Sequence, residues 1–161
     1  NIAYTFNYNA DGQMQKISMK TDGKDDEGSY SESGEINYTY NNKVLEKIEA
    51  KSKNVTCSQT YEYTQAIKNT YNAMPLLLLP EELASDDCVF NVFAITGYLG
   101  NAGANLPTAM TIKNTDLEDP SENSTERYNL SYTLNENKAI SSYTLSGYGE
   151  TMTFPCDWTN F

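Results

Sequence analysis

Two acidic clusters contain the side chains whose types could most directly do chemistry. The first comprises Asp22, Asp25, Asp26 and Glu27. The second comprises Asp116, Glu118, Asp119 and Glu122. Their oxygens could bind Ca²⁺, but neither cluster has the alternating Asp-x-Asp-x-Asp-Gly spacing of an EF-hand loop. We therefore predict two solvated acidic loops, within residues 21–34 and 114–126, and leave open whether the first cluster binds a cation.

The residue types that most catalytic sites need are missing. The sequence has no His, so neither a Ser-His nor a Cys-His dyad can form, and the usual zinc and copper ligand is absent. No G-x-S-x-G motif occurs, and the glycine-rich residues 97–103 lack the Lys-Ser/Thr of a phosphate-binding loop. Two carboxylates could hydrolyse a glycosidic bond, but among 22 acidic residues some pair will always look suitable. We predict no catalytic, cofactor-binding or metal-binding residue, and no cofactor.

The three cysteines have no C-x-x-C spacing, so neither a zinc site nor a dithiol redox motif is predicted. Cys57 and Cys156 both lie in predicted strands and could form a disulfide. The alternative is that Cys57, Cys88 and Cys156 are all small buried hydrophobic residues.

Aromatic residues and a small-residue loop are the remaining candidates for binding. Four of the 13 tyrosines fall outside the predicted inward faces and could stack on sugar rings or aromatic ligands: Tyr30, Tyr71, Tyr98 and Tyr148. Packing between neighbouring strands is the alternative. The loop Gly100–Leu106 could let a ligand or another backbone approach closely, although plain turn chemistry explains it equally well.

Charge and hydropathy exclude several classes of partner. The chain has 11 basic and 22 acidic residues, a net charge of −11, which repels nucleic-acid phosphates and anionic lipid headgroups. Its mean hydropathy is −0.62, and its longest aliphatic run, Leu76–Leu79, is too short to be a transmembrane helix. We predict one domain over residues 1–161 and no nucleic-acid partner.

Alternation of apolar and polar residues predicts the elements that must position any site. Hairpins are expected over residues 1–64 and 108–161, giving about nine strands. Predicted inward residues include Ile17, Met19, Val44, Ile48 and Tyr61. Between the two halves, residues 65–107 read as a partly helical, Leu-rich insertion that covers the sheet.

Three segments repeat one hairpin pattern, which implies a sheet built by duplication. An aromatic strand, a polar turn and a strand containing Ile recur at residues 6–20, 38–51 and 131–145. The fold class is therefore mainly β: a curved antiparallel meander, or a partly closed barrel, with the insertion in the middle.

Two resemblances follow from these segments. FNYNADGQMQKI resembles the tyrosine–aspartate repeat hairpins of bacterial surface proteins. The aromatic hairpins, the central GYLGNAGANLP and the terminal FPCDW together resemble a family of secreted Bacteroidetes lipoproteins of unknown function with a porin-like fold. That resemblance implies a curved antiparallel sheet rather than a pore. It also implies an extracytoplasmic location, in the periplasm or at the cell surface, with a lipid anchor upstream of Asn1.

The leading hypothesis is a non-enzymatic domain of the cell envelope or cell surface, with a binding or structural role and an unknown extracellular or periplasmic partner. One alternative is a carrier that holds an apolar ligand between the sheet and residues 74–99. A second is a hydrolase of extracellular glycans that uses paired carboxylates.

Overall fold

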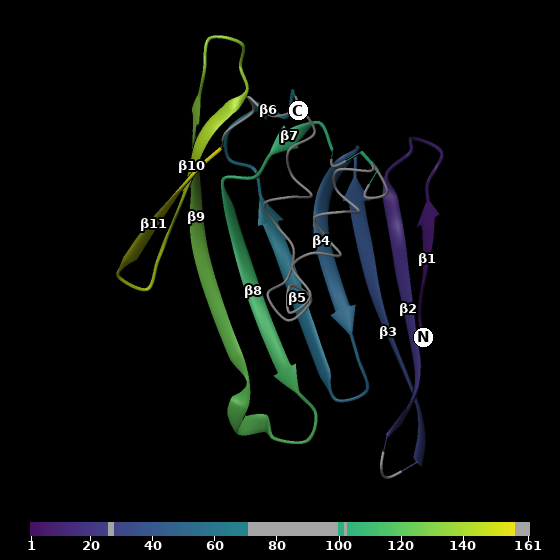
Figure 1. The fold of residues 1–161 in the computed structure, drawn as a ribbon. Helices are drawn as coiled ribbons and strands as arrows, with labels where there is room; N and C mark the ends of the chain where they lie inside the picture. The colour runs from purple at the N-terminus through teal and green to yellow at the C-terminus, as the bar shows by residue number, and fades with distance from the viewer. Residues whose placement is uncertain (26–27, 71–99, 102, 157–161) are drawn as a thin grey trace.

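A computed structural model describes residues 1–25, 28–70, 100–101 and 103–156, and its centre is one nine-stranded antiparallel sheet (Figure 1). Each strand pairs with the next one of the sheet along the chain, so the sheet is a meander. The described strands do not close into a barrel, because β1 and β11 remain at opposite edges. The nine strands are β1 (Ile2–Tyr8), β2 (Met14–Asp25), β3 (Gly28–Asn41), β4 (Val44–Lys51), β5 (Val55–Glu62), β8 (Ala109–Asp116), β9 (Ser124–Leu134), β10 (Ile140–Gly147) and β11 (Glu150–Pro155).

The three repeated segments form the hairpins β1–β2, β3–β4 and β9–β10, as the sequence predicts. Their turns contain residues at positive φ: Gly12 at 73°, Asn42 at 49°, Lys43 at 66° and Lys138 at 63°, of which Gly and Asn adopt this conformation most readily. Asn9 and Asn135 act alike, because each side-chain Oδ1 accepts two backbone N–H groups of its own turn.

The three hairpins share a β-bulge that the sequence analysis did not predict. In each, one residue of the return strand is matched to no residue of the first strand in the register: Gln15, Glu46 and Ser141. A bulge shifts the alternation by one residue. The residue just before each bulge therefore joins the buried face, and Met14, Leu45 and Ile140 are all buried.

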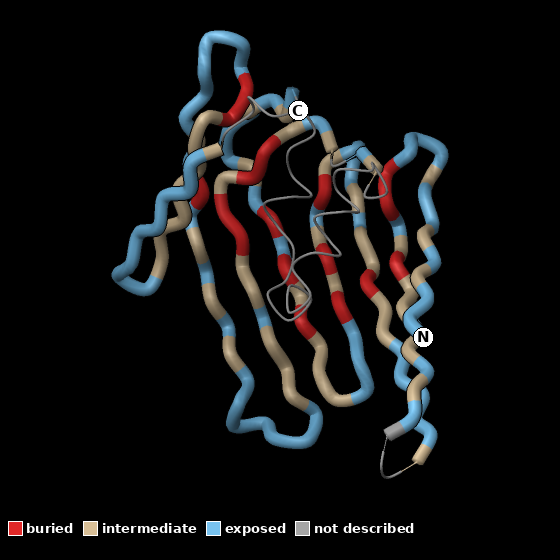
Figure 2. The backbone as a smooth tube through the Cα atoms, in the orientation of Figure 1, coloured by how far each residue is buried: buried red, intermediate tan, exposed pale blue. Residues whose placement is uncertain are grey.

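The sheet has one buried and one wet face, which we call the core face and the polar face. The buried residues recur along the strands (Figure 2). Matched residues form rows across the core face, for example Phe6, Ile17, Ile36, Ala50 and Cys57. The polar face carries ion pairs between Lys16 and Glu35, Lys47 and Glu49, and Arg127 and Glu62.

A small sheet consists of β6 (Ile67–Lys68) and β7 (Asn105–Leu106). It lies at the end of the large sheet where the β1–β2, β3–β4 and β9–β10 turns are (Figure 1). Residues 100–101 and 103–106 lie along two hairpin turns, where Asn101 N donates to Gly12 O and Ala104 N donates to Lys43 O. A Cβ atom on Gly100 would lie 2.6 Å from Gly12 O. This confirms that the loop lets another backbone approach closely.

Three expectations about local structure need correction or fall outside the described residues. Within the predicted loop of residues 21–34, residues 21–25 and 28–34 are strand, because β2 runs on to Asp25 and β3 begins at Gly28. Val44 is not the buried residue of its strand, since the bulge places Leu45 on the core face. Most of the predicted helical insertion, residues 71–99, lies outside the described residues.

Candidate functional site

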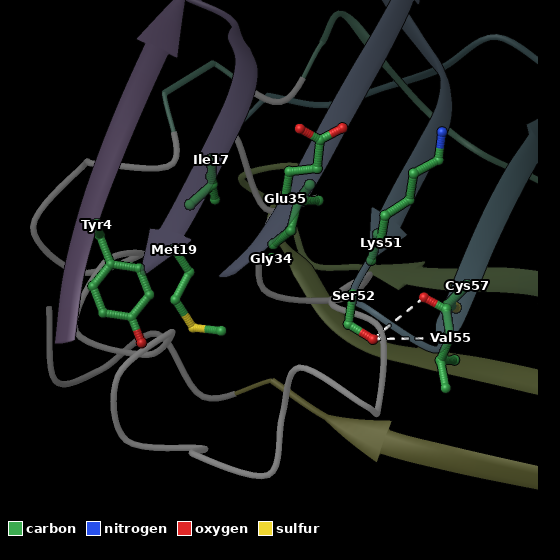
Figure 3. A pocket seen from close by; sticks show the side chains of 11 residues that line it. Tyr4, Ile17, Met19, Gly34, Glu35, Lys51, Ser52, Val55 and Cys57 are labelled. Atoms are coloured by element: carbon green, nitrogen blue, oxygen red, sulfur yellow. Dashed lines mark hydrogen bonds between the residues drawn. The ribbon is translucent and has the colours of Figure 1, made fainter. Parts of the chain in front are cut away.

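An apolar pocket opens on the core face of β1–β5 (Figure 3). Its volume is about 120 Å³, close to the cavity of about 150 Å³ that admits benzene in other proteins. Eleven residues line it, among them Tyr4, Met19, Gly34, Val55 and Cys57. It is large enough for a small apolar group.

The pocket exists because short side chains occupy core-face positions between larger ones. Gly34 is opposite Met19, which is opposite Tyr4, and Ala50 is opposite Cys57. An ideal Cβ on Gly34 would lie 3.4 Å from Lys51 O and 3.6 Å from Met19 Cε, which are ordinary contacts. The backbone of Gly34 therefore accepts a side chain, and the absence of one leaves the space open.

Charged groups point away from the pocket. Figure 3 shows Met19 and Ser52 on one side of the strands and the side chains of Glu35 and Lys51 on the other. Hydrogen bonds from Lys16 and Asn37 lower the pKa of Glu35, which keeps this carboxylate charged on the polar face. Glu35 and Lys51 therefore contribute mainly backbone to the pocket wall.

A cluster of tyrosine hydroxyls lies on the core face next to the pocket. Tyr38 follows the pocket residue Ile36 by two positions, and Gln59 follows Cys57 in the same way. Burial raises the pKa of Tyr61 well above its usual value, and the nearby Tyr38 and Tyr63 hydroxyls add to this shift. These residues lie near one another in a weakly polar environment.

Two of these hydroxyls have protein partners, and two have none within the described part of the chain. Tyr61 donates to Gln59 Oε1 at 2.6 Å, and Tyr63 donates to the Leu45 carbonyl at 2.6 Å. Among the residues that the structure describes, the hydroxyls of Tyr38 and Tyr40 have no hydrogen bond. Sequence analysis missed this cluster because it treated these tyrosines as packing residues and overlooked Gln59.

The first acidic cluster is only partly described. Asp22 pairs with Lys20 at 3.1 Å, and hydrogen bonds from Ser31 and Lys20 lower its pKa. Asp25 ends β2, while Asp26 and Glu27 lie outside the described residues. The possibility of a cation at this cluster therefore stays a prediction.

Two carboxylates of the second acidic cluster accept hydrogen bonds from the backbone of their own loop. Asp116 Oδ1 accepts the backbone N–H groups of Glu118 and Asp119. Asp119 caps the short 3-10 helix η2 (Pro120–Glu122) by accepting from Ser121, which lowers the Asp119 pKa. Nowhere in the described part of the chain do three or more Cys, Asp or Glu side chains gather as a metal site would require.

Among the described residues, the candidate cysteines and tyrosines do not come together in one site. Cys57 lies in the core and is not bonded to Cys156, which follows β11, so the disulfide alternative is not seen; Cys88 lies outside the described residues. Tyr30 covers Gly23 in the β2–β3 hairpin, where an ideal Cβ would lie 2.3 Å from Tyr30 Cζ.

Tyr148 lies near the opposite edge of the sheet, in the turn between β10 and β11, where its hydroxyl donates to the Thr125 carbonyl. Tyr30 and Tyr148 therefore do not form a shared platform, and Tyr71 and Tyr98 lie outside the described residues. Within the described segments, no helix is both long and apolar enough to cross a membrane.

Comparison with known proteins shows which fold this chain has. A porin-like protein from Bacteroides vulgatus ATCC 8482 matches with a TM-score of 0.58 and 14% identity, over 94% of this chain and 62% of that one. A porin-like protein from Bacteroides uniformis ATCC 8492 matches with a TM-score of 0.57 and 20% identity, over 95% of this chain and 56% of that one. This chain thus spans roughly three fifths of the length of these structures.

No curated protein matches the chain. A family model described as a domain of unknown function (DUF4595) with porin-like fold matches residues 1–142, which confirms the family resemblance drawn from the hairpins and the central loop. The chain therefore belongs to the DUF4595 family of domains with a porin-like fold.

Proposed function

We propose that this chain is a non-enzymatic binding domain that holds an apolar group in the pocket on β1–β5. The pocket itself carries the proposal: its wall is mostly apolar side chains and backbone, its Ser52 hydroxyl is hydrogen-bonded to the Val55 backbone, and its charged neighbours face the other way. Sites for small molecules are typically concave and mostly apolar with few polar groups. This favours the carrier role among the roles considered from the sequence.

We further propose an extracytoplasmic location, in the periplasm or at the cell surface, with a lipid anchor on the full-length protein. Support comes from the resemblance of the hairpins and the central loop to a family of secreted Bacteroidetes lipoproteins. Mass spectrometry of the natural protein, fractionated from cell envelopes, tests this: recovery from the cytosol would refute it.

Glycan hydrolysis by paired carboxylates has weaker support. A general acid in such a site needs a raised pKa. Among the described carboxyl groups, those with a shifted pKa all have it lowered: Asp22, Glu35, Glu49 and Asp119.

Filling the pocket tests the binding role. The substitution Gly34→Leu places four carbon atoms in the space that a ligand would occupy, and Ala3→Leu on the polar face adds an apolar side chain elsewhere as the control. We expect hexane to shift the NMR signal of the Met19 methyl group in the wild type and in Ala3→Leu. In Gly34→Leu, hexane affinity should fall by about tenfold or more because the space is occupied. Equal hexane binding by the folded Gly34→Leu variant would refute the pocket as the site.

A further inference from the structure

The core face offers a ligand hydrogen-bond donors but no positive charge. Every Lys and Arg in the nine strands alternates onto the polar face: Lys16, Lys20, Lys24, Lys47, Lys51, Lys113 and Arg127. The carboxylates of Asp116 and Glu126, by contrast, share the core face through their pairing with Val55 and Ile112. A ligand anion would therefore lose its hydration here without gaining a counter-ion.

Two donors that have no partner among the described residues lie close to the pocket. Tyr38 stands two residues beyond Ile36 on β3, about 7 Å along the strand. Tyr40 follows on the same face, and neither hydroxyl has a hydrogen bond among the described residues. Their neighbours Tyr61 and Tyr63 are already engaged with Gln59 and Leu45. The two open hydroxyls thus face the same side of the sheet as the pocket.

A half-buried hydroxyl without a protein partner is a position that water or a ligand acceptor completes. Burial raises the pKa of Tyr40 to about 12, and burial likewise raises the pKa of Tyr38, so both groups stay protonated donors at neutral pH. A protonated tyrosine can donate to a carbonyl, ether or hydroxyl oxygen.

We propose that the ligand is a neutral amphipathic molecule whose apolar end fills the pocket on β1–β5 and whose oxygen acceptor binds the Tyr38 hydroxyl, beside Tyr40. This deepens the proposed function and rests on it. The class includes esters, amides and alcohols with a short chain, and it excludes free carboxylic acids at neutral pH.

Three probes that share a six-carbon chain separate the pocket assignment from the ligand class: hexane has no acceptor, methyl hexanoate has a neutral acceptor, and hexanoate is an anion. We expect methyl hexanoate to bind several-fold more tightly than hexane and at least about tenfold more tightly than hexanoate, measured through the Met19 methyl signal. Equal or tighter binding of hexanoate would overturn the proposal.

The Tyr38→Phe variant removes the donor and keeps the ring. Loss of one hydrogen bond should weaken methyl hexanoate about 2- to 10-fold and leave hexane unchanged. Tyr30→Phe is the matched control, since Tyr30 lies eight residues away on the same strand and is exposed. If Gly34→Leu abolishes binding of both probes but Tyr38→Phe changes neither, only the ligand class is wrong. If Gly34→Leu changes neither probe, the pocket assignment fails as well.

Discussion

The hydrogen bond between Tyr61 and Gln59 allows a quantitative test of the core. Gln59 and Tyr61 are 3% and 6% exposed, and the Tyr61 hydroxyl lies 2.6 Å from Gln59 Oε1. Gln59 is matched to Ile48 on β4 and Ile112 on β8, so both cross-strand neighbours of its amide are apolar. Each polar group therefore depends on the other for its hydrogen bonding.

Removing both partners should cost less than the two single removals added together. Tyr61→Phe leaves the Gln59 acceptor buried without its donor, and Gln59→Met leaves the Tyr61 hydroxyl without its acceptor. Each change should lower the free energy of unfolding by about 1–3 kcal/mol, whereas the double variant should lose less than the sum because no polar group is stranded. The expected coupling is about 1–3 kcal/mol.

Urea denaturation of the four proteins measures this coupling from the midpoint and slope of each transition. Thr153→Val is a control for an exposed hydroxyl pair, since Thr153 and Thr144 lie 3.0 Å apart on the surface, and it should change stability by about 0.5 kcal/mol or less. A double variant as unstable as the two single variants together would show that the bond is not formed in solution.

Two further predictions concern alkaline pH and the bulges. Burial raises the pKa of Tyr40 to about 12 in the folded protein, so its contribution to stability is complete below the unfolded value of about 10 and is lost as pH rises toward 12. Urea midpoints should therefore fall between about pH 9 and pH 12 as tyrosinate absorbance appears, and an unchanged midpoint would contradict the burial of this hydroxyl. Because the bulge buries Leu45 and leaves Val44 only half-buried, Leu45→Ala should cost about 2–5 kcal/mol and Val44→Ala clearly less. The reverse order in thermal melts would place the bulge elsewhere.

The strands were predictable because the alternation of apolar and polar residues directly indicates which side of each strand is buried. Tyr4, Ile17 and Ile48 lie where the period of two places them, and Gly12 takes the positive φ that its turn requires. The nine-stranded count and the antiparallel order follow from the same pattern together with short turns.

The errors come from positions where local composition and tertiary structure disagree. Residues 21–34 look like a loop because Asp, Glu, Ser and Gly favour turns, yet ten matched pairs hold β2 to β3 through this segment and beyond it. Glu46 is an ordinary strand residue in the sequence, and only pairing with β3 reveals it as the extra residue of a bulge.

The candidate site was less predictable than the fold. The pocket arises from Gly34, Ala50 and Cys57, residues far apart in sequence whose short side chains coincide only when the register is known. Gln59 was overlooked because a polar residue at an inward position interrupts the expected pattern, and its partner Tyr61 appears only in the structure.

Residues 69 and 104 lie side by side, so the number of residues between them does not determine the geometry of the sheet. Asn69 N donates to the Ala104 carbonyl at 3.0 Å, so the chain leaves and returns at one point, and Ala104 N donates to Lys43 O in the β3–β4 turn. Closing a loop twice as long costs only about 0.6 kcal/mol more. Relatives can therefore differ widely in what they carry between these two residues while the same nine strands stay in register.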